Sequence, residues 1–256
     1  EGLPENPAGF VILPPNLTGA RGTDDRHLLA WLARQHDSGA ILCSVCAGAF
    51  WLGHAGLLRG RVATTHWALA GEMQASFPAT CVDADAILID DGDIITAGGV
   101  MAWVDLGLHI IRLTAGATIM AQTARHFLVD PGARDQRAYR AFRPARSHGD
   151  AAILRVQNWL ETHYGEPLSA VALAARANLS ARTFLRRFKA RTGFTPVAYI
   201  QNLRIERARG LLERTSKPVT DIAWSVGYRD VSAFGRVFHH LTGITPGDYR
   251  RRFSVR

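Results

Sequence analysis

The sequence has few cysteines and no long hydrophobic run. Only three of its 256 residues are cysteines, which is too few for a disulfide framework. Cys43 and Cys46 have the spacing of a redox or zinc half-site, but no second pair of this kind accompanies them. No apolar run reaches the roughly 18 residues of a membrane span, and no signal peptide opens the chain. These absences exclude a secreted disulfide scaffold and a membrane protein, and they favour a reduced, cytoplasmic protein.

Metal-binding patterns are missing as well. The histidines at positions 36, 54, 109 and 126 share no ligand spacing of the HExxH kind. The acidic run Asp90–Asp93 lacks the length and the closing Glu of a calcium loop, and it is typical of a hairpin turn. We therefore expect neither a metal nor a cofactor.

Positive charge is scarce in the first half of the chain and abundant in the second. Residues 1–128 carry 7 Arg and no Lys against 12 acidic residues, a net charge of −5. The whole chain has a net charge of +8, so residues 129–256 carry +13. An asymmetry of this size indicates two functions, and the basic half has the electrostatics of a polyanion-binding domain.

The first half alternates strand-like and helix-like segments. Its apolar patterns predict strands at 10–13, 40–45, 62–65, 87–89 and 94–96, and helices at 24–36, 49–58, 69–77, 100–113 and 118–128. Such alternation predicts an α/β domain with a flavodoxin-like, mostly parallel sheet over residues 1–128. The stretch 129–150 is rich in Arg, Gly and Pro, and we interpret it as a linker that wraps one domain.

From Ala151 onward every segment predicts helix, and the sequence repeats itself. FLRRFKARTGFTPVAY at 184–199 matches FGRVFHHLTGITPGDY at 234–249, at a spacing of 50 residues. Upstream the match continues at a spacing of 49, so the second copy holds one extra residue in its turn. Two copies in register are far more specific than a single helical hairpin.

Each copy has the pattern of a helix-turn-helix. The predicted helices are 169–177 and 181–191 in the first copy and 220–226 and 231–241 in the second, with a bridging helix over 199–212. Asn178-Leu179 forms the first turn, and Gly227 supplies a left-handed residue in the second. Ser180 and Asp230 cap the second helix of each copy, because their side chains can accept from free backbone amides.

The second helix of each copy has an apolar face and a polar face. Four phenylalanines spaced four residues apart are expected to pack inward: Phe184, Phe188, Phe234 and Phe238. The opposite face is free for the DNA major groove, with Arg182 and Arg186 in the first copy and Ser232 and Arg236 in the second. Further arginines are expected to contact phosphates: Arg204, Arg207, Arg250, Arg251 and Arg252.

Residues 151–253 resemble a known family in the segment RIERARGLLERTSKPVTDIAWSVGYRDVSAFGRVFHHLTGITPGDYRRRF. It looks like the signature region of the AraC/XylS transcriptional regulators. The resemblance implies a seven-helix domain that binds asymmetric promoter sites, usually activates transcription and works with RNA polymerase. By position, the family's base-reading residues correspond to Arg182, Leu185 and Arg186 in the first unit and to Val231, Ser232, Ala233 and Arg236 in the second. Because Leu185 and Val231 are apolar, we expect them to contact thymine methyl groups or no base.

The first half resembles the ThiJ/PfpI group, relatives of the class I glutamine amidotransferases. The resemblance rests on VCAGAF around Cys46, AGLLRGRVATTHW ending at His66-Trp67, and TAGGVMAWVDLGLHII from Thr96. Together the two halves look like the amidotransferase-like subgroup of AraC regulators, whose first domain is thought to sense a small metabolite. This implies an unknown small-molecule effector and a homodimer. The family's domain size leaves open whether a segment of about 60 residues precedes Glu1. The residues expected to contact the effector are Cys46, Ala47, His66, Trp67, Gly98 and Gly99.

Three roles are open for Cys46, which lies where a strand meets a helix. A helix N-terminus lowers the pKa of a thiol, and Cys46 with His66 would be the minimum for a nucleophilic hydrolase. Against catalysis, Ala47 stands where hydrolytic members of the group place His, and a DNA-binding partner domain makes sensing sufficient. A sensing cysteine and a structural cysteine are the alternatives.

We therefore predict a sequence-specific transcription factor with a ligand-sensing first domain, not an enzyme. Cys46 and His66 stay as residual catalytic candidates. The rival hypothesis is a cysteine-dependent amidase or hydratase with an accessory DNA-binding domain. A third is a nucleoid-type protein that binds DNA without sequence preference.

Overall fold

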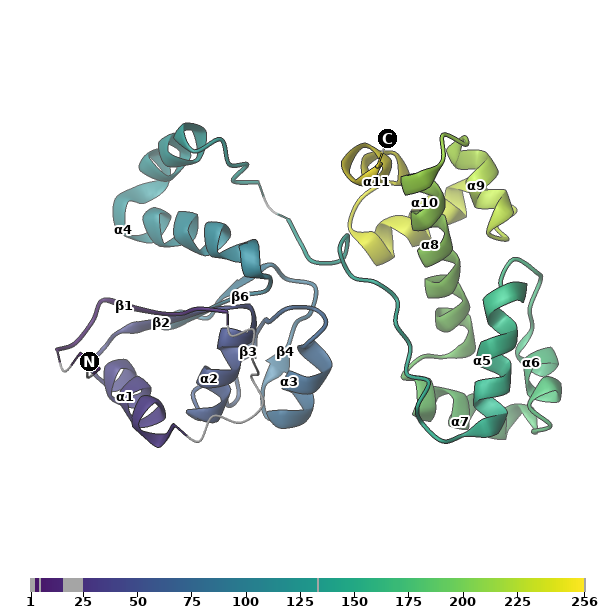
Figure 1. Cartoon of the computed structure of the whole chain (residues 1–256), viewed down its shortest axis with the longest axis horizontal. Coiled ribbons are helices and arrows are strands. Elements are labelled where there is room, and N and C mark those ends of the chain that lie inside the picture. Colours follow the sequence, from purple (N-terminus) through teal and green to yellow (C-terminus); the bar gives the residue numbers. More distant parts are fainter. Residues whose placement is uncertain (1–2, 5, 16–24, 133, 256) are drawn as a thin grey trace. The chain divides into compact units, whose positions relative to one another are not determined.

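The computed structural model describes residues 3–4, 6–15, 25–132 and 134–255. The chain divides into two compact units, Glu1–Gln136 and Arg137–Arg256 (Figure 1). The first is an α/β unit and the described part of the second is helical. The boundary between them falls inside the stretch 129–150.

A four-stranded sheet forms the centre of the first unit, in the order β1-β2-β6-β5. β1 (Phe10–Leu13), β2 (Ile41–Val45) and β6 (Ile94–Ala97) run parallel, and β5 (Leu88–Asp90) pairs antiparallel with β6 at the edge. β2 and β6 are buried almost throughout, because a parallel sheet is covered on both faces. β5 and β6 confirm the predicted hairpin, with Gly92 at φ +86 in its turn.

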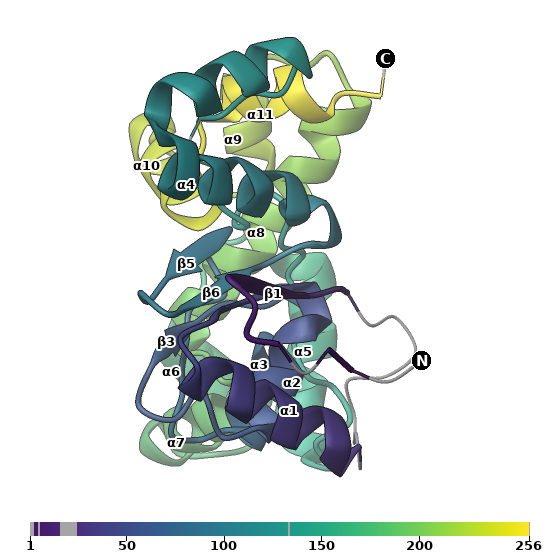
Figure 2. The same ribbon diagram turned by 90° about the vertical axis from the view of Figure 1, so that its left-hand side faces the viewer.

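Helices cover both faces of this sheet (Figures 1 and 2). α1 (Arg26–Asp37), α2 (Ala49–His54) and α3 (Ala70–Ser76) lie on one side, and α4 (Trp103–His126) lies on the other. Successive residues of a strand point to opposite faces, so Leu42 joins the apolar cluster beneath α1 and α2, while Cys43 joins the cluster beneath α4. The predicted α/β architecture with a mostly parallel sheet is confirmed. The predicted first residue of α1, Asp24, lies outside the described residues.

Some elements are shorter than the patterns predict. α2 ends early because Gly56 adopts a left-handed φ of +76 shortly after it. β3 (Val62–Ala63) also ends early, since the next amide, that of Thr64, donates to the hydroxyl of Thr96 (2.8 Å) instead of to a strand. β4 (Cys81–Val82) pairs in parallel with β3 and was not predicted, because two residues carry no periodicity.

The two helices expected at 100–113 and 118–128 form one kinked element. A 3-10 turn, η2 (Val100–Ala102), leads into α4, and Gly116 breaks the helical backbone with φ 86 and ψ 167. By length and composition this stretch could cross a membrane, a property that the apolar runs did not indicate. A single helix of this kind is weak evidence for a membrane span, and α4 carries Asp105 in an ion pair with Arg134 (2.5 Å).

Seven helices make up the described part of the second unit. They are α5 (Ala151–His163), α6 (Ala170–Arg176), α7 (Ala181–Thr192), α8 (Pro196–Arg214), α9 (Val219–Ser225), α10 (Val231–Thr242) and α11 (Pro246–Phe253). α8 runs through the middle, with α5 to α7 gathered at one end and α9 to α11 at the other (Figure 1). Each end has its own apolar core, in which the predicted phenylalanines of α7 and α10 are fully buried.

The two ends of this unit repeat the same local contacts. Gly193 and Gly243 end α7 and α10 in left-handed conformations, with φ of 78 and 75. Directly before them, the buried hydroxyls of Thr192 and Thr242 donate to the phenylalanine carbonyls one helical turn back (2.7 and 2.8 Å). The repeat of 50 residues in the sequence is therefore a repeat of structure.

Residues 137–150, called the strap below, are part of the second unit. The guanidinium of Arg209 on α8, which is 6% exposed, donates to the carbonyls of Arg137 (2.7 Å) and Arg140. Further along, the amide of Phe142 donates to a carboxylate on α8, and its ring packs into the aromatic core of the first helix-turn-helix. Burial lowers the pKa of Arg209. Its hydrogen bonds to two backbone carbonyls hold the start of the strap against α8.

Candidate DNA interface and candidate sensing site

α7 presents a basic outer face. The hydroxyl of Ser180 caps the helix by accepting a hydrogen bond from the Thr183 amide (3.3 Å). The predicted base-reading residues Arg182, Leu185 and Arg186 are all exposed, and 42% of Leu185 is accessible. Two guanidiniums about one helical turn apart, with an apolar side chain between them, can contact guanine edges and a thymine methyl group.

α10 repeats this geometry with less charge. Asp230 caps the helix by accepting from the Ser232 amide (2.8 Å). Ser232 and Arg236 are exposed, whereas Val231 and Ala233 are half-buried, and Val231 packs against the second apolar core. The Arg236 guanidinium, 73% exposed, lies 3.9 Å from the Asp230 carboxylate. Of the four residues predicted to read bases here, Ser232 and Arg236 are the most accessible.

Arg204, on α8, connects two loops of the second unit through hydrogen bonds to their backbone. Its three guanidinium nitrogens donate to the carbonyls of Tyr164 (2.7 Å), Glu166 (2.8 Å) and Gly227 (3.0 Å). Burial lowers the pKa of this side chain. Each nitrogen already binds the backbone of the loops beside α6 and α10, and the expected phosphate contact of Arg204 stays a prediction.

The other predicted phosphate contacts, Arg207, Arg250, Arg251 and Arg252, lie nearer the surface with partners of their own. Arg207 pairs with Glu161, and Arg251 pairs with Asp248. Arg250 donates to the Lys217 carbonyl, and Arg252 lies over the Tyr139 ring. Exposed ion pairs are weak in water, so Arg207 and Arg251 can exchange their carboxylates for phosphates. Arg250 is half-buried and donates to a backbone carbonyl (2.6 Å), which makes it the least suited of the four.

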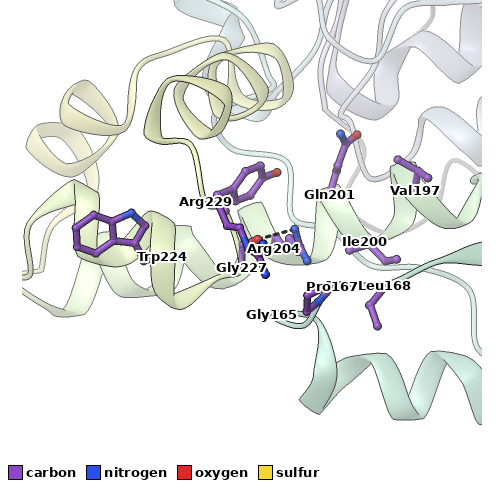
Figure 3. A pocket seen from close by; sticks show the side chains of 11 residues that line it. Gly165, Pro167, Leu168, Val197, Ile200, Gln201, Arg204, Trp224, Gly227 and Arg229 are labelled. Atoms are coloured by element: carbon purple, nitrogen blue, oxygen red, sulfur yellow. Dashed lines mark hydrogen bonds between the residues drawn. The ribbon is translucent and has the colours of Figure 1, made fainter. Parts of the chain in front are cut away.

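The extra residue of the second turn is Arg229, at the rim of a cleft (Figure 3). The cleft has a volume of about 710 Å³ and is lined by the loop before α6, by α8 and by the turn before α10. Gly227, at φ +89, lies so close to Gly165 that a Cβ would be 2.4 Å from the Gly165 carbonyl oxygen. Arg229 is exposed directly before the cap of α10, so it adds a positive charge that the sequence pattern did not single out.

Cys46 lies at a strained elbow between β2 and the 3-10 turn η1 (Cys46–Gly48). Its φ of +55 is a left-handed conformation, which costs a non-glycine residue about 1–3 kcal/mol and is concentrated at functional sites. Burial raises the pKa of the thiol, and a hydrogen bond with the Ala47 backbone lowers it less. The predicted lowering by a helix N-terminus is therefore wrong, because desolvation outweighs it. Burial also raises the pKa of Cys43, to about 12, and neither thiol is in a disulfide.

His66 has partners other than the Cys46 thiol. Its Nδ1 accepts from the Ala68 amide (3.1 Å), and its ring packs against Trp67 at 5.2 Å between centroids. Burial lowers the pKa of His66. Within the described part of the chain, no hydrogen bond joins the Cys46 thiol to His66; the hydroxyl of Thr65 donates to the Cys46 carbonyl instead (2.8 Å).

Gly98 and Gly99 follow β6 directly. The Gly98 amide donates to the carbonyl of Ile87 (2.8 Å), so this amide already has a partner within the chain. Gly99 is half-buried, and its carbonyl accepts from the Ala102 amide (3.0 Å) at the start of η2. Because Gly98 has no side chain, it leaves room for the side chain of Gln136: a Cβ on Gly98 would lie 2.2 Å from Nε2 of Gln136.

Gln136 is the site residue that sequence reasoning missed. Its side chain is 2% exposed, donates to the carbonyls of Thr65 (2.8 Å) and Ala86 (2.9 Å), and accepts from the Trp67 amide (2.9 Å). Through Thr65 and Gln136 the structure brings together Cys46, Trp67 and Gly98. No signal marks this glutamine in the sequence, because it stands in a polar, Arg-rich stretch that is typical of a solvated linker.

Both units match known protein families. Residues 8–113 match the DJ-1/PfpI family, and residues 173–252 match a helix-turn-helix domain. The regulator CdhR of Pseudomonas aeruginosa is 29% identical over 225 residues, which are 87% of this chain and 66% of CdhR. GlxA of Rhizobium meliloti is 31% identical over 224 residues, which are 86% of this chain and 68% of GlxA. Both are HTH-type transcriptional regulators, and the chain spans about two thirds of their length.

A solved structure is also similar to the second unit. The DNA-binding domain of AdpA, in complex with a target DNA, is 33% identical over 40% of this chain and 92% of that chain, with a TM-score of 0.39. The identity to GlxA extends through both units and covers more than two thirds of GlxA. The chain therefore belongs to the AraC/XylS family of transcriptional regulators, in the subgroup that carries a DJ-1/PfpI domain ahead of its helix-turn-helix domain.

Proposed function

We propose that this regulator recognises a promoter sequence with α7 and α10 of one chain. The observation that carries the proposal is the pair of accessible polar faces on two equivalent scaffolds, Arg182 with Arg186 and Ser232 with Arg236. The continuous helix α8 joins the two scaffolds. Its 19 residues span about 28 Å at 1.5 Å per residue, close to the roughly 34 Å between successive major-groove segments. One chain can then read two adjacent turns of DNA.

A binding titration tests this proposal. The full chain is titrated at fixed salt against DNA from its own upstream region, with random DNA as competitor. Arg186→Ala should lose specific affinity, while Arg155→Ala, an exposed arginine on α5, serves as the matched control. Equal affinity for upstream and random DNA would contradict sequence recognition and favour a nucleoid-type protein.

The first unit, in this proposal, senses a small molecule and does not convert it. Support comes from the buried Cys46 with its raised pKa, the lack of a described hydrogen bond to His66, and Ala47 in place of a histidine. A protonated thiol is a poor nucleophile, so alkylation of Cys46 by iodoacetamide should stay slow at pH 7 and accelerate only at high pH. Turnover of amides or isonitriles that disappears in Cys46→Ala would instead establish the enzyme.

We also propose the remaining partners, and family membership supports them. A regulator of this kind acts in the cytoplasm, forms a homodimer through its first unit and recruits RNA polymerase as an activator. Sedimentation of the full chain tests the dimer, and transcription in vitro from the upstream region with purified polymerase tests activation. Lower transcription on adding the protein would identify a repressor.

A further inference from the structure

A buried polar cluster lies where β2 and β6 end, next to the Cys46 elbow. Its members are Ser44, Thr64, Thr65, Thr96 and Gln136, each at most 2% exposed. Ser44 and Thr96 are paired in register on neighbouring parallel strands, and the Thr64 amide donates to the Thr96 hydroxyl. Open α/β sheets bind their ligands at this edge, beyond the carboxyl ends of the strands. The hydroxyl of Ser44 has no hydrogen-bond partner within the described chain.

The side chain of Gln136 fills the middle of this cluster, and its partners define a slot for one chemical group. Three oxygens face its nitrogen: the carbonyls of Thr65 (2.8 Å) and Ala86 (2.9 Å) and the hydroxyl of Thr64 (3.2 Å). One donor, the Trp67 amide (2.9 Å), faces its oxygen. A group that fits the slot must therefore donate N–H bonds on one side and accept a hydrogen bond on the other, as a primary carboxamide does.

Other common groups do not fit this arrangement. A carboxylate would place an oxygen against the carbonyls of Thr65 and Ala86, with no proton between them. A guanidinium has donors only, so it would leave the half-buried amide of Trp67 without an acceptor. The slot is therefore selective for a carboxamide over the acids and bases of similar size.

The slot and the group that fills it come from different parts of the first unit. Its walls belong to the body of the unit, at Thr64 to Trp67, Ala86 and Gly98. Gln136 arrives from the segment after α4, where its own amide donates to the Asp85 carbonyl (2.7 Å). It is the last residue of the unit, and the carbonyl of the next residue, Arg137, is held by Arg209 in the second unit.

We propose that this slot is the effector site and that Gln136 is a tethered stand-in for the effector, a small molecule with a primary carboxamide. This rests on the proposed sensing function of the first unit. A short tether keeps the internal carboxamide at an effective concentration in the millimolar range, so an effector competes with it. An effector that displaces Gln136 releases the chain directly before the strap, and in this way reaches the DNA-binding unit.

Propionamide, the side chain of glutamine without its backbone, is the probe. Gln136→Ala in the full chain empties the slot, and we expect propionamide to bind this variant at least about tenfold more tightly than the wild type, measured by calorimetry and by the rise in Tm. Propionate and guanidinium should not bind. Gln35→Ala, which removes another buried glutamine of the first unit, is the matched control and should bind propionamide no better than the wild type.

A second variant tests the wall of the slot, and the Tm of each variant shows whether it folds. Gly98→Ala keeps Gln136 but places a Cβ where its Nε2 lies, so it should expel the side chain and also narrow the slot against propionamide. Equal binding of propionamide to wild type, Gln136→Ala and Gly98→Ala, or equal binding of propionate, would overturn the proposal. The probe needs no DNA, so the two proposals can fail separately. Tighter binding of propionamide to Gln136→Ala in a protein that does not bind DNA specifically would contradict only the regulator. Specific DNA binding without tighter propionamide binding would contradict only the slot.

Discussion

The two helix-turn-helix units share one scaffold but differ in the surfaces they present. Their cores, their caps and the glycines that end α7 and α10 are equivalent at a spacing of 50 residues. The exposed face of α7 carries Arg182 and Arg186, whereas that of α10 carries Ser232 and Arg236, with Asp230 close to the guanidinium. The residues that build the fold and those that face a partner are therefore separate sets, except for Val231, which belongs to both.

The turns differ as well. Asn178 makes the first turn with φ 54, and asparagine tolerates this left-handed conformation. Gly227 makes the second with φ 89, packed against Gly165, and Arg229 is added after it. The second turn is therefore more constrained than the first, although it is one residue longer.

The largest expected effect tests the shared scaffold. Phe188→Ala and Phe238→Ala each remove a fully buried ring at equivalent positions, so each should lower the free energy of unfolding by about 3–5 kcal/mol. Urea denaturation measures both. Leu185→Ala on the exposed face of α7 is the control and should change stability little. A large loss from only one phenylalanine would break the equivalence of the two cores.

The next effect separates the turns. Gly227→Ala forces a Cβ against the Gly165 carbonyl at a positive φ, so it should cost about 3 kcal/mol, from strain and overpacking together. Asn178→Ala only places an alanine in a left-handed backbone conformation, so it should lower the free energy of unfolding by about 1 kcal/mol. Thermal unfolding of the two variants checks the order, and equal costs would mean that the contact with Gly165 is easily relaxed.

These structural features were predictable to different degrees. The helices, caps and buried phenylalanines of the second unit follow from periods of three to four residues, which are local and visible in the sequence. The buried hydrogen bonds of Arg204, Arg209 and Gln136 were not predicted, because their acceptors lie 23 to 72 residues away in the chain. A glutamine or arginine in a polar context looks solvated until the fold buries it, and the desolvation that raises the pKa of Cys46 has the same origin.

A smaller effect compares the reading faces. Arg186→Ala should cost about 1–3 kcal/mol of specific binding, as expected for loss of one base-contacting arginine. Arg236→Ala should cost less within that range, because Asp230 offsets part of its charge. Affinity for the upstream DNA, measured at one salt concentration, gives both values. A greater loss from Arg236→Ala would place the principal reading face on α10.

The smallest effect concerns phosphate contacts. Arg251→Ala should weaken binding to specific and random DNA alike and reduce the slope of log affinity against log salt by about 1. Titrations at several salt concentrations measure this slope. An unchanged slope would show that Arg251 stays with Asp248 when DNA is bound.

Footprinting of one regulator on its upstream DNA tests most directly whether the two faces read adjacent turns of the helix. We predict two protected major-groove segments about one turn apart for each chain, with Arg186→Ala losing protection at one segment and Arg236→Ala at the other. Loss of the same segment in both variants, or a single protected segment per chain, would contradict the two-site reading.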